Sequence, residues 1–159
     1  MRWLSSIQGM SVAFHFEHPE HPADIDALEL SERLLRFNLS RRGGNWQVLL
    51  ILVRDEQGKI AGGIAGGSRW GRGEIETLWL EEEARGQGLG RSLLERAERD
   101  LRNRGCRWVD LETFEFQAPD FYRKAGYQAL FELETSPEGG ARKFWMRKHL
   151  TDSVEPAAP

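Results

Sequence analysis

The stretch that decides the fold is LWLEEEARGQGLGRSLL, residues 78–94. An apolar, strand-like run ends at Leu80, and a run with apolar side chains at helical spacing begins at Leu89. Alternating glycines lie between the two runs. Backbone N–H groups at a helix N-terminus are unsatisfied and carry the positive end of the helix dipole, so they bind phosphate oxygens. The stretch therefore predicts a strand, a phosphate-binding turn and a helix.

The glycine pattern differs from two better-known phosphate-binding motifs. A P-loop continues from its last glycine into Lys and then Ser or Thr, whereas Gly90 is followed by Arg91 and Ser92. The dinucleotide fingerprint G-x-G-x-x-G also fails, because residues 86–90 have the pattern G-x-G-x-G. Neither a P-loop nor a Rossmann turn is predicted.

Apolar periodicity and turn residues predict the elements on both sides of this stretch. We expect strands over 11–17, 46–54, 59–68, 74–80, 107–113, 127–134 and 142–148, and helices over 23–40, 88–104 and 118–125. The Gly and Ala content of residues 59–68 indicates that another backbone or a ligand approaches that strand closely. This order of elements requires a mixed α/β sheet with helices on its faces.

Composition sets the class of protein. The 159 residues are 40% hydrophobic and 30% charged, which is typical of a single globular domain. A net charge of -3 gives no basic field, so we expect neither nucleic acid nor a membrane as partner. Cys106 is the single cysteine and no export signal is evident, so we expect a cytoplasmic location. We predict one domain over 11–150, between an N-terminal extension, 1–10, and a flexible tail, 151–159.

Two signatures together resemble a known family. The first is Arg85-x-x-Gly88-x-Gly90 in the context given above, and the second is FYRKAGY, residues 121–127. Both are similar to motifs of the GNAT superfamily of N-acetyltransferases, and the resemblance extends over residues 48–149. It implies a mixed, mostly antiparallel sheet of six to seven strands flanked by helices, in a single layered domain. It also implies acetyl-CoA as co-substrate, with no metal.

The resemblance implies a cofactor site built mainly from backbone. In such folds two strands splay apart, and the pantetheine arm lies in the opening like a short extra strand. Arg91 has an equally simple alternative role, as a solvated helix charge paired with Glu95. The residues expected to contact acetyl-CoA are Leu78, Leu80, Arg85, Gly86, Gln87, Gly88, Leu89, Gly90 and Arg91.

Two residues are candidates for the chemistry. Tyr122 matches the position where many members carry a tyrosine near the cofactor sulfur, and its phenol can protonate the departing thiolate. Its alternative is a core tyrosine. Glu76 is the candidate base for the amine, because alternation along a strand places it on one face with Leu78 and Leu80. Glu74 is expected on that same face and is the alternative base.

Several other residues carry weaker indications. Glu115 stands where many members have Asn, so an amide contact to the cofactor is missing or is replaced by Gln117. Trp70 and Phe116 either line the acceptor pocket or pack on the surface. Cys106 is expected to be buried. His15, His18 and His21 recur every third residue, but without a completing ligand set we expect a solvated loop and no metal site.

These inferences predict an enzyme that transfers the acetyl group of acetyl-CoA to a primary amine by direct attack in a ternary complex. The alternative is a CoA-binding sensor or interaction module that does not catalyse a reaction. The acceptor is unknown, and small-molecule and peptide amines both stay open, because acceptor contacts lie in variable loops. A homodimer is possible through the closing strands, where residues 144–146 are expected to offer apolar surface.

Overall fold

The computed structural model describes residues 24–150 and divides the chain at Gly43 into two units. In the first unit, helix α1 (Asp24–Arg42) confirms the helix predicted over 23–40. Glu29 and Glu32 form i,i+4 ion pairs with Arg33 and Arg36 at 2.5 and 2.7 Å, which support the helix. The strand predicted over 11–17 lies outside the described residues, as do 1–10 and 151–159.

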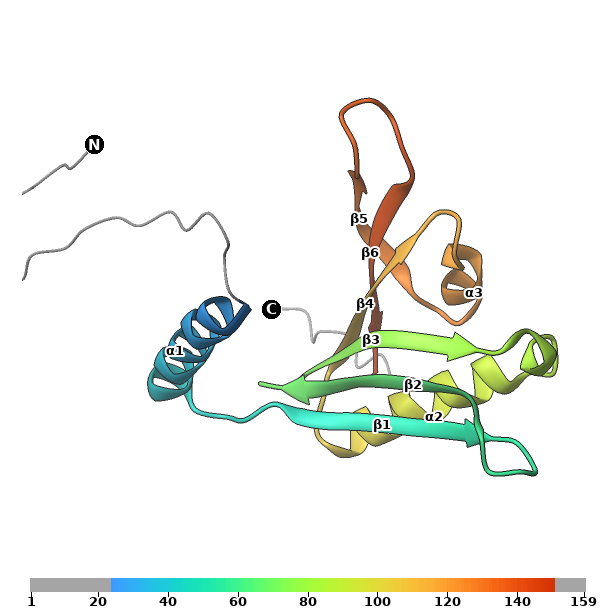
Figure 1. The fold of residues 1–159 in the computed structure, drawn as a ribbon, viewed down its shortest axis with the longest axis horizontal. Helices are drawn as coiled ribbons and strands as arrows, with labels where there is room; N and C mark the ends of the chain where they lie inside the picture. The colour runs from blue at the N-terminus through green and yellow to red at the C-terminus, as the bar shows by residue number, and fades with distance from the viewer. Residues whose placement is uncertain (1–23, 151–159) are drawn as a thin grey trace, which may run out of the picture. The chain divides into compact units, whose positions relative to one another are not determined.

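The second unit, from Gly44, contains the sheet and the helices α2 and α3 (Figure 1). Every predicted element within it is present, with ends that agree within about two residues. Its elements are β1 (Gln47–Arg54), β2 (Ile60–Arg69), β3 (Arg72–Leu80), the 3-10 turn η1 (Glu82–Ala84), α2 (Leu89–Asn103), β4 (Trp108–Phe114), α3 (Pro119–Lys124), β5 (Gln128–Glu134) and β6 (Arg142–His149).

The six described strands form one mixed sheet in the order β1-β2-β3-β4-β6-β5. Its neighbours are antiparallel except for β3 and β4, which run parallel because α2 carries the chain from the end of one strand back to the start of the next. This arrangement is the α/β, mostly antiparallel sheet flanked by helices that the sequence predicts.

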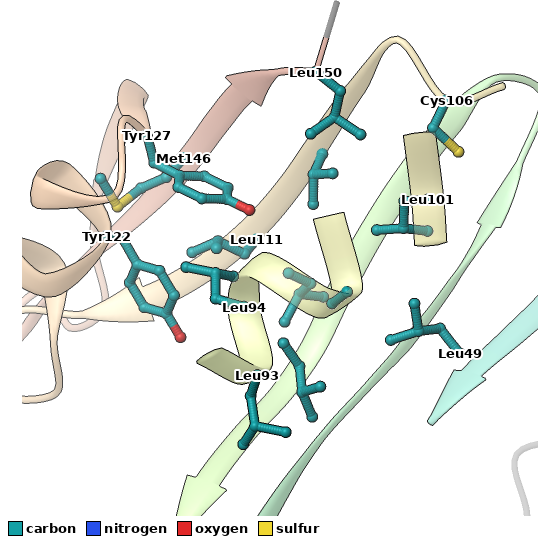
Figure 2. Close-up of a cluster of buried hydrophobic side chains, with 14 of the residues drawn as sticks. Leu49, Leu93, Leu94, Leu101, Cys106, Leu111, Tyr122, Tyr127, Met146 and Leu150 are labelled. Carbon is teal, nitrogen blue, oxygen red and sulfur yellow. The ribbon is translucent and has the colours of Figure 1, made fainter. Parts of the chain in front are cut away.

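The core lies on the face of the sheet that α2 covers. The apolar stripe of α2 supplies Leu93, Leu94, Ala97 and Leu101, all at most 2% exposed. Burying one such leucine stabilises the fold by roughly 1.5–3 kcal/mol. Figure 2 shows Tyr122 of α3 and Tyr127 beside this cluster, together with Met146 of β6. Both α2 and α3 therefore pack against the same face.

A β-bulge in β3 determines where the sheet opens. Ala65 pairs with Thr77 while Gly66 pairs with Ile75, so Glu76 is an extra residue without a partner in β2. A side chain at Gly66 would overlap the carbonyl group of Glu74, which confirms the close backbone approach predicted from the glycines of this strand. Bulges twist and bend a strand, and β3 separates from β4 directly after this one.

Candidate active site

A large cavity lies where β3 and β4 separate. The last residues paired between the two strands are Ile75 and Leu111. Beyond them the cavity has a volume of about 1120 Å³ and is lined by the second half of β3, the glycine turn, the end of β4 and α3. This volume is slightly above the usual range for small-molecule sites, about 300–1,000 Å³.

The edge of β3 that faces this cavity has hydrogen-bonding groups that pair with no neighbouring strand. The N–H of Glu81 donates to the carbonyl oxygen of Ala61 at 2.9 Å, and antiparallel pairs alternate between hydrogen-bonded and non-bonded. Trp79, two residues before Glu81, therefore belongs to the next hydrogen-bonded pair between β2 and β3. The N–H and C=O groups of Leu78 and Leu80 point away from β2, toward the opening.

Across the opening, the backbone groups at the edge of β4 are already hydrogen-bonded to Gln117. The Gln117 side-chain oxygen accepts a bond from the N–H of Phe114 at 2.9 Å, and the Gln117 N–H donates to the Phe114 carbonyl at 2.9 Å. Glu115 is turned to Arg142 at 2.8 Å, and this hydrogen bond lowers the pKa of the Glu115 carboxyl. An extended ligand can thus pair with β3, while Gln117, not Glu115, lines the cavity.

The glycine turn presents an uncovered backbone to the cavity. Gly86 and Gly88 have φ values of 74° and 79°, a left-handed conformation that favours glycine. A Cβ atom at either position would meet no atom within 4 Å, so the space above the turn is open to a ligand. Gly88 is the N-cap of α2, whose first N–H groups are available to an anion.

The polar side chains near the turn have separate partners. Arg85 donates from Nε to the carbonyl oxygen of Leu80 at 2.9 Å, and its guanidinium lies 4.8 Å from the Trp79 ring centre. Arg91 lines the cavity and is paired with Glu95 at 2.9 Å, so both roles considered for it are compatible with the geometry. The Gln87 side chain donates a hydrogen bond to the Glu83 carbonyl oxygen at 2.7 Å. Of the residues expected to contact the cofactor, Gln87 is the one that does not line the cavity.

Tyr122 combines burial with access to the cavity. It is 8% exposed, packs edge-on against Phe121 and Tyr127, and lines the cavity wall. Burial raises the pKa of its phenol, which keeps the hydroxyl protonated at neutral pH. A protonated phenol is the form required of a proton donor.

The two candidate bases differ in position. Glu76 lines the cavity and makes no ion pair or side-chain hydrogen bond within the described residues. The face expected for Glu76 and Glu74 is wrong for both, because the bulge shifts the alternation: Ile75, not either glutamate, faces the core together with Leu78 and Leu80. Glu74 therefore lies on the opposite face, where it pairs with Arg72.

Sequence reasoning missed three residues near Glu76. Glu112 and Lys143 line the main cavity and form an ion pair, and Trp145 lines a smaller cavity beside it. These residues come from β4 and β6, and no local motif marks them. Phe116 lines the main cavity, whereas Trp70 lines neither of the two.

Other predicted features were also tested by the structure. Cys106 is buried as expected, and burial raises the pKa of its thiol. Among residues 24–150 no cluster of His, Cys, Asp and Glu side chains could hold a metal ion, and His15, His18 and His21 lie outside that range. No helix in the same range is long and apolar enough to span a membrane.

Comparisons with known proteins agree with this geometry. The model of the "Acetyltransferase (GNAT) family" matches residues 10–127. A blasticidin-S acetyltransferase from Streptomyces morookaense is 40% identical over 85 residues, which are 53% of this chain and 62% of that protein's length. An uncharacterized N-acetyltransferase from Methanocaldococcus jannaschii is 32% identical over 84% of this chain and 90% of that protein's length.

A solved structure extends the likeness to the fold. A crystal structure of an acetyltransferase from Bacillus cereus has a TM-score of 0.71 and 30% identity, over 84% of this chain and 97% of that one. Together with the family match and the open edge of β3, this likeness identifies the kind of enzyme. The chain belongs to the GNAT family of acetyltransferases and is an N-acetyltransferase whose co-substrate is acetyl-CoA.

Proposed function

We propose that this chain transfers the acetyl group of acetyl-CoA to a primary amine by direct attack in a ternary complex. One observation carries the proposal: a single cavity joins an open strand edge, an uncovered glycine turn, a buried phenol and an unpaired carboxylate. Leu78 and Leu80 would pair with the amides of the pantetheine arm. The backbone of residues 85–90 would bind the pyrophosphate, with Arg85 and Arg91 at its edge.

Glu76 and Tyr122 would each move one proton of the reaction. Glu76 accepts a proton from the ammonium form of the acceptor, directly or through water, so that the amine nitrogen can attack the thioester carbon. A C–N bond forms, the nitrogen of the tetrahedral intermediate loses its second proton to water, and the C–S bond then breaks. Tyr122 donates its phenolic proton to the departing thiolate and regains one from solvent, since its raised pKa disfavours the phenolate.

The acceptor is an amine, and its identity belongs to this proposal. Small molecules and peptide N-termini or lysines are the candidate acceptors. The name of the Streptomyces relative makes blasticidin S one compound to include among the acceptors tested. The match covers 62% of that protein's length, so its acceptor is not carried over to this chain.

A thiol-release assay over a panel of amines, run beside calorimetric titration with acetyl-CoA, tests the function. We expect acetyl-CoA to bind and thiol release to require an amine. Binding without turnover on any amine would favour the sensor alternative. Thiol release that occurs first in the absence of amine, with an acetylated enzyme detected by mass spectrometry, would contradict direct attack.

Assembly and location stay predictions. Phe144 and Met146 are buried in the core, so the expectation that residues 144–146 offer apolar surface is wrong for two of the three. Edge strand β5 instead exposes Leu130, Phe131 and Leu133, each 47–50% exposed, and a homodimer would pair through this edge. Light scattering tests the dimer, and cell fractionation tests the cytoplasmic location.

A further inference from the structure

A second, smaller cavity adjoins the amine end of the main one. Its volume is about 230 Å³, enough for roughly seven water molecules. It shares Ile75, Glu76 and Glu112 with the main cavity. Leu111, Trp145 and Glu74 complete its lining, and none of these three lines the main cavity. A molecule held by Glu76 can therefore extend a second group into this space.

The charges around the small cavity are not balanced. Glu74 pairs with Arg72, and Glu112 pairs with Lys143. Glu76 has no such partner, so three carboxylates face two bases and one negative charge is left over. Neither base lines the small cavity, whereas all three carboxylates do. The interior therefore favours a cation.

The aromatic wall favours an organic cation over a metal ion. Trp145 is stacked on Phe131 of β5, with ring centres 5.7 Å apart and planes at 20°, which fixes the indole beside the carboxylates. Ammonium and guanidinium groups bind well where an aromatic face and carboxylates meet. The carboxylates form no group that could hold a metal ion.

The charges also change along the combined cavity. At the cofactor end, Arg85, Arg91 and the uncovered N–H groups of the turn supply positive potential. At the other end, Glu76 and Glu112 form the junction and Glu74 lies beyond it. A substrate with two cationic groups would match this end of the cavity, with one group at the junction and the other near Glu74.

We propose that the small cavity binds a cationic group of the acceptor other than the amine that is acetylated. The preferred acceptors are then diamines or amines with a guanidinium group. This inference rests on the proposed function, because it takes Glu76 as the contact of the reacting amine. Glu74 acts as a specificity residue for the second cation, because it lines the small cavity and not the main one, and a cation bound there shares the Glu74 carboxylate with Arg72.

Three acceptors with one shared skeleton test it: 1,5-diaminopentane, hexylamine and 6-aminohexanoate. They differ at the far end by an ammonium, a methyl and a carboxylate group. We expect kcat/KM for the diamine to exceed that for hexylamine by about tenfold, as for a hydrogen bond to a charged group, and the amino acid to be the poorest. Equal values for diamine and hexylamine, or a preference for the amino acid, would overturn the proposal.

Two variants distinguish an effect of the small cavity from a general effect of the protein's negative charge. Glu74→Gln keeps the shape and should bring the ratio of diamine to hexylamine close to one. Glu56→Gln, in the exposed turn between β1 and β2, removes the same charge elsewhere and should leave the ratio unchanged. If both variants lower the ratio equally, the small cavity is not the cause of the preference for the diamine.

A binding measurement keeps this test distinct from that of the enzyme activity. Calorimetric titration of the CoA complex with 1,5-diaminopentane and with hexylamine needs no turnover. If no amine is acetylated but the diamine still binds about tenfold more tightly, the proposed function fails and the cation site stands. Equal affinities for the two compounds would refute the cation site, whether or not acetylation occurs.

Discussion

The two ends of the active-site cavity are built in different ways. The proposed cofactor end consists of the unpaired strand edge at Leu78 and Leu80 and of the turn over residues 85–90, which are close together in the chain. The proposed acceptor end consists of side chains from three strands, Glu76 of β3, Glu112 of β4 and Trp145 of β6. Backbone recognition tolerates changes of side chain, whereas side-chain recognition depends on each residue. One end can therefore stay the same while the other changes its substrate.

The strongest test of the backbone-built end is Gly88→Val. At φ 79°, a β-branched residue is strained and its methyl groups would occupy the open space above the turn. We expect the rise in melting temperature caused by acetyl-CoA to disappear. Gly58→Val is the matched control, because Gly58 has φ 81° and equally open surroundings in the turn between β1 and β2.

Both variants should lose about 1–2 kcal/mol of stability through backbone strain, but Gly58→Val should keep the response to acetyl-CoA. If Gly88→Val still binds acetyl-CoA with unchanged affinity, the turn does not hold the cofactor.

Tyr122→Phe tests the chemistry at the junction of the two ends. The ring packing against Phe121 and Tyr127 remains, and the proton donor is lost. We expect kcat and kcat/KM to fall together by about a hundredfold, with the acetyl-CoA affinity nearly constant. Stopped-flow thiol release and calorimetry measure the two quantities. A normal kcat would make Tyr122 a packing residue.

A smaller effect is expected for Arg85→Ala, which removes one side chain from the backbone-built end. Arg85 bonds the Leu80 carbonyl and lies on Trp79, within reach of the turn. Loss of a charge-assisted contact to phosphate should weaken acetyl-CoA binding by about tenfold. Arg99→Ala, on the exposed side of α2, is the control and should have no effect. A loss as large as that of Gly88→Val would mean that side chains, not backbone, dominate this end.

The smallest effect is expected for Arg91→Ala. Its ion pair with Glu95 is 77% and 55% exposed, so the change in unfolding free energy should stay below about 0.5 kcal/mol. Acetyl-CoA affinity should fall by only about two- to threefold and should depend on salt, because the contact is at the edge. A salt-independent loss would give Arg91 a direct, desolvated contact with phosphate.

The same contrast explains what the sequence could predict. The turn, α2 and the Tyr122 signature are local patterns, so their element types and the cofactor end follow from residue spacing. The bulge at Glu76 is not visible in the sequence, because it arises from the register between β2 and β3. For that reason strict alternation placed Glu74 on the wrong face.

The acceptor end depends on sheet order, which residue spacing does not contain. Glu112 and Trp145 become neighbours of Glu76 because β4 lies between β3 and β6. Phe144 and Met146 similarly face the core because β6 is an inner strand packed under α3. Predicting these residues needs the strand pairing as well as the pattern of each strand.

Amide hydrogen exchange with and without acetyl-CoA, measured by NMR, tests most directly that the edge of β3 holds the cofactor. The amides of Leu78 and Leu80 should exchange fast in the free protein and become protected on binding, as should those of the turn at 86–90. The Trp79 amide, bonded to β2, should be protected in both states and serves as the internal control. If acetyl-CoA binds while Leu78 and Leu80 exchange as fast as before, the cofactor is held elsewhere and the account is contradicted.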